Sequence, residues 1–274
     1  MEFGMPTLIE NGDLQESAQL CSELGLAFIE LNMNLPQYQT ERICRVHDLR
    51  EIAERYHIYY TIHLDENLNV CDFNHGVAEA YQDTVKRAVQ TAEELNIPLL
   101  NMHMNEGVYF TLPDRRVYLF EQYKDRYLCA LQRFRDLCDK SVKDSGILIS
   151  IENTDGFRPF QQEGIELLLE SSVFSLTWDI GHSHGAREAD ESFITGHMER
   201  VKHFHIHDGS GRQNHLPLGT GEINLASRLG LAAVNGCRCV VETKTVQALR
   251  ESVEWLNHHG YPVKAPCNGG GIIE

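Results

Sequence analysis

Short apolar runs alternate with longer segments of helical periodicity along the whole chain. Each run has the length of a strand, and the segments between runs carry apolar residues at the spacing of an amphipathic helix. The pattern predicts strands over 7–9, 27–31, 58–64, 98–104, 146–152, 174–180, 201–207 and 238–242. It predicts helices over 14–24, 38–56, 76–95, 117–143, 161–171, 188–199, 225–234 and 246–259, and a long loop over 105–115.

This alternation favours one fold class. Strands that alternate with helices form a parallel sheet. Eight such units in 274 residues suit a closed (β/α)8 barrel, the TIM barrel of α/β proteins, better than an open doubly wound sheet. No linker interrupts the pattern, so residues 1–274 are predicted to form a single domain, with the glycine-rich stretch 268–271 as a loose end.

Side-chain alternation turns a set of polar groups toward the inside of this barrel. Residues i, i+2 and i+4 of a strand share a face, so His203, His205 and His207 point one way. Phe204 and Ile206 point the other way, toward the helices. The same count turns four more strand-end residues inward: Glu152, Asp179, His63 and His103. Small polar residues are expected beneath these four: Ser150, Thr177, Thr61 and Asn101.

The overall charge restricts the kind of partner. The formal net charge is −16, and no cluster of Lys or Arg is longer than a pair. Such a chain repels nucleic-acid backbones and anionic membranes unless it builds a local basic groove, so a small molecule is the expected partner. Whether the chain forms a homo-oligomer is left open.

The location is expected to be cytoplasmic. No apolar run approaches the ~18 residues of a membrane span, and residues 1–6 lack a signal-peptide pattern. The eight cysteines include no C-x-x-C pair and are interpreted as small buried hydrophobes.

The strand ends carry the candidate chemistry. They bring Glu30, His63, His103, Glu152, Asp179, His205 and Glu242 together, and His182 and His215 follow on loops. Burying carboxylates and imidazoles together is costly unless a cation compensates. One divalent ion held by Glu152, Asp179, His205 and Glu242 would supply that charge, and this set of oxygen and nitrogen donors suits Mn, Co, Zn, Fe or Mg. A competing interpretation makes Asp179 only the N-cap of the next helix.

Several segments resemble one known superfamily. They are Ile149 to Asn153, Trp178 to His182, His203 to Asp208, His215 to Ile223 and Val240 to Glu242. In composition and order these segments are similar to the xylose-isomerase-like barrels, which include sugar-phosphate isomerases, epimerases and endonuclease IV. The resemblance covers nearly the whole chain and is specific for the superfamily rather than for a substrate.

The resemblance implies a function. In ketose 3-epimerases, Glu, Asp, His and Glu at the ends of strands 5 to 8 hold the metal, and these fall on Glu152, Asp179, His205 and Glu242. The two glutamates would also act as acid and base on opposite faces of a small sugar or sugar phosphate. The reaction would be an isomerisation or epimerisation through a metal-stabilised enediolate.

The resemblance also assigns substrate contacts. His63, His103 and His182 are expected to contact the sugar, and Arg212 either contacts it or is a solvated loop arginine. Trp178 is expected to face outward. Tyr109, Phe110 and Phe157 either line the pocket as a wall or are instead packed in the core or exposed.

Other functions remain open. An endonuclease IV-type zinc phosphodiesterase would use a larger metal set that includes His63, His103, His182 and His215. The aspartate of that set, two residues before His215, is replaced here by Gln213. A non-catalytic sugar-binding barrel is a further alternative, and dehydratases and lyases begin with the same proton abstraction.

Overall fold

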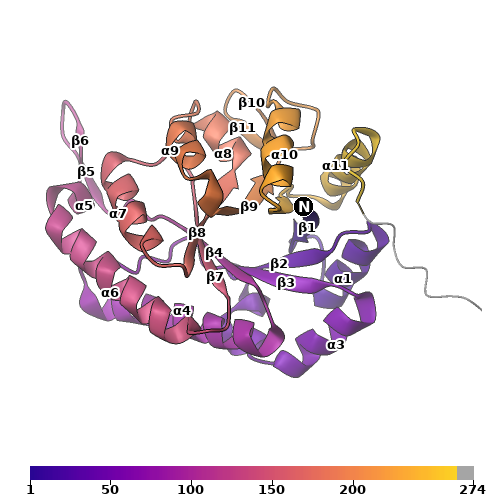
Figure 1. Cartoon of the computed structure of the whole chain (residues 1–274), viewed down its shortest axis with the longest axis horizontal. Coiled ribbons are helices and arrows are strands. Elements are labelled where there is room, and N and C mark those ends of the chain that lie inside the picture. The colour runs from indigo at the N-terminus through magenta and orange to yellow at the C-terminus, as the bar shows by residue number, and fades with distance from the viewer. Residues whose placement is uncertain (264–274) are drawn as a thin grey trace, which may run out of the picture.

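The computed structural model describes residues 1–263, and their main feature is a closed barrel of eight parallel strands (Figure 1). The order around the barrel is β1-β12-β9-β8-β7-β4-β3-β2, so strands that are neighbours in sequence are neighbours in space. The (β/α)8 fold class is therefore confirmed. The strands are β1 (Glu2–Pro6), β2 (Phe28–Asn32), β3 (Tyr59–His63), β4 (Leu99–His103), β7 (Leu148–Glu152), β8 (Phe174–Asp179), β9 (Val201–Ile206) and β12 (Arg238–Val241).

Helices follow the strands around the outside of the barrel. The longer ones are α1 (Leu14–Glu23), α3 (Val46–Tyr56), α4 (His75–Leu95), α6 (Lys124–Val142), α7 (Pro159–Leu169), α10 (Leu225–Val234) and α11 (Val246–His258). The shorter ones are η1 (Pro36–Tyr38), α2 (Thr40–Ile43), α5 (Leu119–Gln122), α8 (Ile180–Gly185), α9 (Glu191–Gly196) and η2 (Met198–Arg200). None of the helices in the described residues is long and apolar enough to cross a membrane.

Two antiparallel hairpins lie in the loops that follow β4 and β9. The first pairs β5 (Tyr109–Thr111) with β6 (Arg116–Tyr118), and the second pairs β10 (Asp208–Ser210) with β11 (Gln213–Leu216). Figure 1 shows β5 and β6 standing away from the barrel, whereas β10 and β11 lie beside α8. Both hairpins follow the carboxyl ends of barrel strands, which is the end where barrel active sites are built.

The outward faces of the strands form the core between barrel and helices. Trp178 is fully buried there, with its ring 5.6 Å from that of Phe204 and the guanidinium of Arg228 from α10 lying 4.6 Å from its centre. The inward faces carry the predicted small polar residues, and Thr177 donates a 2.7 Å hydrogen bond to Ser150. The alternation read from the sequence therefore holds on β7 and β8.

The position predicted for the first strand is wrong. The structure has it at Glu2–Pro6, not 7–9, and Ile9 is 80% exposed. Gly4 sits in this strand because a Cβ atom there would lie 2.5 Å from the ring of Phe28. A run that contains glycine and ends on proline does not have the composition of a strand, which explains the error.

Three predicted helices are also interrupted. The 38–56 segment is divided into α2 and α3, with a break at Cys44 and Arg45. The start of the 117–143 segment is drawn into β6 by pairing with β5. The 188–199 segment is divided into α9 and η2, and the helix α8, which was not predicted, precedes it directly after β8. Between α8 and α9, Arg187 and Glu188 adopt left-handed backbone with φ of 56° and 58°.

Two other expectations have mixed outcomes. Among the described residues Cys21, Cys71, Cys138, Cys237 and Cys239 are buried as expected, whereas Cys44 and Cys129 are exposed. The loose end predicted at 268–271 lies outside the described residues. The single domain over 1–274 stays a prediction.

Candidate metal centre

The four residues predicted to ligate a metal lie together at the carboxyl end of the barrel. Glu152 and Asp179 are the last residues of β7 and β8, His205 lies in β9, and Glu242 directly follows β12. One oxygen or nitrogen atom of each lies within 4.8 Å of the corresponding atoms of the others. The first three are at most 1% exposed. Parallel strands that end at the same level of a closed barrel bring these side chains to one point.

His205 stands in the middle of this group. Its Nδ1 atom lies 3.1 Å from Oε1 of Glu152, 3.1 Å from Oε2 of Glu242 and 3.9 Å from Oδ2 of Asp179. On the other side of the ring, Nε2 lies 2.8 Å from Oε1 of Glu30. When the proton of a neutral imidazole sits on Nε2, the lone pair of Nδ1 is free to bind a cation. Glu30 favours this state of the ring.

Glu30 is the member of the site whose role the sequence did not assign. It lies in β2, is 2% exposed, and receives a 3.1 Å hydrogen bond from Thr61. Thr61 donates to Oε2 of Glu30, and Nε2 of His203 lies 3.0 Å from the same oxygen. Burial raises the pKa of Glu30, but His205 and His203 outweigh burial and hold that pKa well below its ordinary value. A buried carboxylate in this position anchors the imidazole of His205 from behind. In the sequence, only its place on the inward-facing side of β2 indicated that Glu30 belongs to the site.

Three residues contact one oxygen of Glu152, Oε2. Oε2 accepts a short hydrogen bond from Asn101 and lies 3.3 Å from Nε2 of His63 and 3.4 Å from Nε2 of His103. Burial raises the pKa of Glu152, but His205 and His103 outweigh it and keep that pKa well below its ordinary value. Burial lowers the pKa of His63, but the hydrogen bond that His63 donates to Glu152 and the negative charge of Glu152 outweigh burial and raise that pKa to about 9. Glu152 is therefore an anion whose other oxygen, Oε1, faces His205.

Asp179 satisfies both interpretations of its position. Its Oδ1 atom accepts the backbone N–H of His182 at 2.6 Å, which caps α8. Nε2 of His207 lies 3.1 Å from Oδ1, and its Nδ1 accepts the backbone N–H of His215 at 2.8 Å. Because Nδ1 of His207 accepts, its proton lies on Nε2 and points at Asp179. The same carboxylate is thus an N-cap and a member of the central group.

Glu242 is oriented by a lysine that the sequence reasoning missed. Nζ of Lys244 lies 2.8 Å from Oε1 of Glu242, and Oε2 turns toward His205. Burial raises the pKa of Glu242, but His205 and Lys244 outweigh it and lower that pKa well below its ordinary value. Lys244 lies two residues beyond Glu242 in the loop after β12, where strand parity no longer applies, so no pattern in the sequence pointed to it.

The donor set fits a divalent cation. Three carboxylates, of which Glu152 and Asp179 are buried and Glu242 is 13% exposed, surround one imidazole nitrogen. Oε2 of Glu242 is itself buried without a hydrogen-bond donor. Carboxylate clusters of this kind are stable only with a compensating positive charge. Three carboxylate oxygens and one histidine nitrogen also form a ligand set common to several divalent metals. These residues could therefore hold one such ion, whose identity the geometry leaves open.

The other predicted substrate residues are distributed unequally. His63, His103 and His182 surround the central group, and the last two keep side chains 18% and 24% exposed at the mouth. Arg212 is exposed at the turn of the β10–β11 hairpin, and no hydrogen bond or ion pair within residues 1–263 joins it to the central group. Gln213 is exposed on β11.

The three aromatic residues considered for a pocket wall lie partly at the surface and partly in the core. Tyr109 and Phe110 are 39% and 57% exposed on the first hairpin. Phe157 is buried, with its ring 5.8 Å from that of Phe193. It therefore packs in the core, which was one of the two options left open.

A buried aspartate fixes the loop that follows the second hairpin. Asp208 accepts backbone N–H groups from Gly209, Gly219 and Gly221 at 2.9 Å and from Ile223 at 3.2 Å. Gly221 approaches closely, since a Cβ there would lie 2.4 Å from the Asp208 carboxylate. The loop that borders the site is therefore held by one side chain.

The closed eight-stranded barrel and the acids and histidines at its carboxyl end define a (β/α)8 protein with a candidate metal centre. The chain belongs to the xylose isomerase-like TIM barrel family, whose model matches residues 18–259. No curated protein sequence matches the chain significantly.

Solved structures with the same fold include several epimerases. A D-tagatose 3-epimerase-like protein is 23% identical, with a TM-score of 0.76, and 96% of this chain and 98% of that chain are covered. A 3-keto-D-glucoside 4-epimerase from E. coli is 12% identical, with a TM-score of 0.74 and coverage of 94% and 99%. D-psicose 3-epimerase from Clostridium cellulolyticum H10, solved with D-tagatose, is 14% identical, with a TM-score of 0.71 and coverage of 96% and 100%. At these identities the likeness shows a shared fold over the whole chain.

Glu30→Gln is expected to weaken metal binding without unfolding the barrel. Gln keeps the shape of the side chain but loses the charge that attracts Nε2 of His205, so affinity should fall about 10- to 100-fold. Competition with a chromogenic chelator for Mn²⁺ or Zn²⁺ measures this directly. Glu254→Gln, an exposed position in α11, is the matched control. Unchanged metal affinity in a folded Glu30→Gln protein would show that Glu30 does not orient His205.

Gly181→Ala is expected to destabilise the chain much more than Gly185→Ala. Both glycines lie in α8, but a Cβ at Gly181 would lie 1.8 Å from the ring of His207, whereas nothing lies within 4 Å of one at Gly185. Overpacking should cost about 1–3 kcal/mol or more, while alanine at Gly185 should be neutral or stabilise by about 0.5–1 kcal/mol. Urea unfolding compares the two, and equal stabilities would refute the close packing of Gly181 on His207.

Proposed function

We propose that the protein is a divalent-metal-dependent isomerase or epimerase of a small sugar or sugar phosphate. The observation that carries the proposal is the convergence of Glu152 and Glu242, from different strands, on one atom of His205: each has one oxygen 3.1 Å from Nδ1. Two carboxylates that flank one point are suited to remove a proton from one face of a substrate carbon and return it to the other. Membership of the xylose isomerase-like family supports the same class of chemistry.

The two glutamates are prepared for proton transfer by their neighbours. His63, His103 and Asn101 engage Oε2 of Glu152. Lys244 engages Oε1 of Glu242. Each glutamate therefore turns one defined oxygen toward the centre and is ionised at neutral pH, the state that a base requires. A divalent ion bound by Glu152, Asp179, His205 and Glu242 would polarise the substrate carbonyl and acidify the adjacent C–H bond.

The remaining groups would position the sugar. His103 and His182 keep exposed edges at the mouth, where they could donate hydrogen bonds to hydroxyl groups. The buried Asp179 holds His182 through both its backbone N–H and its ring. A histidine anchored at two points loses little rotational freedom on binding.

An endonuclease IV-type phosphodiesterase is the second candidate, and one observation favours it. His63, Glu152 and His205 also form a group that could hold a cation, beside the first. Two features weigh against it: Gln213 is exposed on β11 and is a neutral amide, and the chain carries a net charge of −16. We therefore place the sugar reaction first.

Glu152→Gln and Glu242→Gln are each expected to lower kcat about 10²- to 10⁴-fold. An amide oxygen still coordinates a metal, although more weakly than a carboxylate, but it is no base at neutral pH. Activity should therefore fall further than metal occupancy, measured by metal analysis of the purified variants. In heavy water, each variant should block C–H exchange from only one of the two epimers. Exchange of both epimers at wild-type rates by both variants would exclude the two-carboxylate mechanism.

Zinc-loaded protein is expected to leave abasic duplex DNA uncleaved. The charge of −16 opposes the duplex at low salt, where electrostatic attraction would otherwise be strongest. A gel assay of a labelled abasic oligonucleotide, scored beside turnover of a ketose panel, separates the two candidates. Efficient zinc-dependent nicking would promote the phosphodiesterase.

A further inference from the structure

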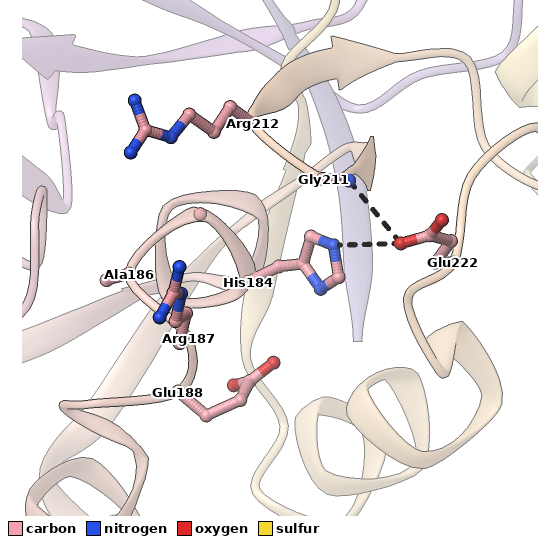
Figure 2. Close-up of a pocket in the computed structure, with 8 residues that line it drawn as sticks. His184, Ala186, Arg187, Glu188, Gly211, Arg212 and Glu222 are labelled. Carbon is pink, nitrogen blue, oxygen red and sulfur yellow. Dashed lines mark hydrogen bonds and ion pairs between the residues drawn. The ribbon is translucent and has the colours of Figure 1, made fainter.

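A cavity lies at the carboxyl end of the barrel, beside the candidate metal centre. Its volume is about 670 Å³, within the size range of small-molecule sites. Its walls are the end of α8 with the following turn, the tip of the β10–β11 hairpin, and Glu222. Arg187 from the turn and Arg212 from the hairpin both line it, and Figure 2 shows their side chains extending to the side away from Glu222.

The acids of this cavity are already engaged. Glu222 accepts hydrogen bonds from the Ser210 hydroxyl at 3.1 Å and the Gly211 N–H at 3.4 Å, and its Oε2 lies 3.6 Å from Nε2 of His184 (Figure 2). Glu188 pairs with Arg228 at 3.0 Å. The oxygens of both acids are thus directed to partners in the protein, and the hydrogen-bond donors of the two arginines are not used by these acids.

The two arginines have no such partners. Within residues 1–263, no hydrogen bond or ion pair to a side chain satisfies the guanidinium of either Arg187 or Arg212. Their N–H donors are therefore free to bind the oxygens of an anion that enters the cavity.

The backbone that carries Arg187 is strained and yet held in place. Arg187 and Glu188 are consecutive non-glycine residues in left-handed backbone, a conformation that costs free energy at each position. Two contacts secure Glu188: its N–H donates to the carbonyl of Ser183 at 2.8 Å, and its side chain pairs with Arg228. This tether keeps the turn that bears Arg187 at the cavity.

The cavity and the metal centre share the same two elements. Helix α8 is capped by Asp179 and carries His182 at its start, and His184 from its end lines the cavity. The hairpin carries His215 near the centre and Arg212 at the cavity. A strand rises ~3.3 Å per residue, so these two positions are about 10 Å apart. A sugar with an oxyanion at the end of its chain is long enough to span that distance.

We propose that Arg187 and Arg212 bind an oxyanion, phosphate or carboxylate, at the end of the substrate remote from the reacting carbon. The inference rests on the proposed function for the sugar itself. A planar guanidinium matches phosphate and carboxylate oxygens in pairs. The cavity thus gives Arg212 a defined role and adds Arg187 as its partner.

The first arm of the test uses inorganic phosphate and needs no turnover. Phosphate titrated into metal-loaded protein, followed by calorimetry, should bind the wild type. Arg187→Gln and Arg212→Gln should each weaken its affinity about 10- to 100-fold. Arg55→Gln is the matched control, because Arg55 is exposed near the end of α3, at the opposite end of the barrel, and its affinity should stay within about twofold. Equal phosphate affinity in the double variant and the wild type would overturn the proposal.

The second arm identifies the oxyanion by turnover. Ketoses, ketose phosphates and keto sugar acids are compared by kcat/KM. The wild type should prefer one anionic class about 100-fold or more over the neutral ketoses, and the double variant should lose that preference mainly through KM. Equal use of neutral and anionic sugars by the wild type would refute the proposal while leaving the proposed function intact. Phosphate binding that depends on both arginines, without turnover of any sugar, would uphold the anion site and reject the proposed function.

Discussion

The candidate site depends on the two-sided contact of one imidazole. His205 meets Glu152 and Glu242 through Nδ1 and Glu30 through Nε2. A ring without Glu30 behind it could rotate or exchange its proton between nitrogens, and the carboxylates in front would then repel one another around a poorly defined point. Because Glu30 comes from β2 and the others from β7, β9 and the end of β12, closure of the barrel is what brings both sides to the ring.

The same closure explains why polar residues so expensive to bury are tolerated here. The carboxylates of the site have positive or hydrogen-bond-donating neighbours. Examples are Thr61 and His203 beside Glu30, and Lys244 beside Glu242. Buried charges paired in this way cost far less than isolated ones. The negative charge that stays uncompensated lies where the acids face one another, and a cation bound there would neutralise it. The energetics of the fold and the chemistry of the proposed reaction thus concern the same atoms.

Much of this arrangement could be predicted from the sequence, because a period of two residues fixes which side chains point inward. His203 and His205 in β9 and His207 directly after it follow that rule and are fully buried. The rule does not say which inward residues touch, since contacts between β2 and β9 depend on the barrel's register. For that reason Glu30 was recognised as a strand-end acid without a role. Lys244 was overlooked because loops have no fixed period. The first strand was placed wrongly because its glycine, Gly4, is required by close packing against the ring of Phe28, which the sequence does not show.

The loop held by Asp208 has a consequence for how a ligand meets the protein. Four backbone N–H groups converge on that carboxylate, so the conformational entropy of the segment is lost when the chain folds and not when a ligand arrives. Association would then resemble docking onto a preformed surface, with a rate governed by diffusion and charge and little delay from loop closure. In this corner of the mouth, selectivity would follow from fixed shape more than from adaptation.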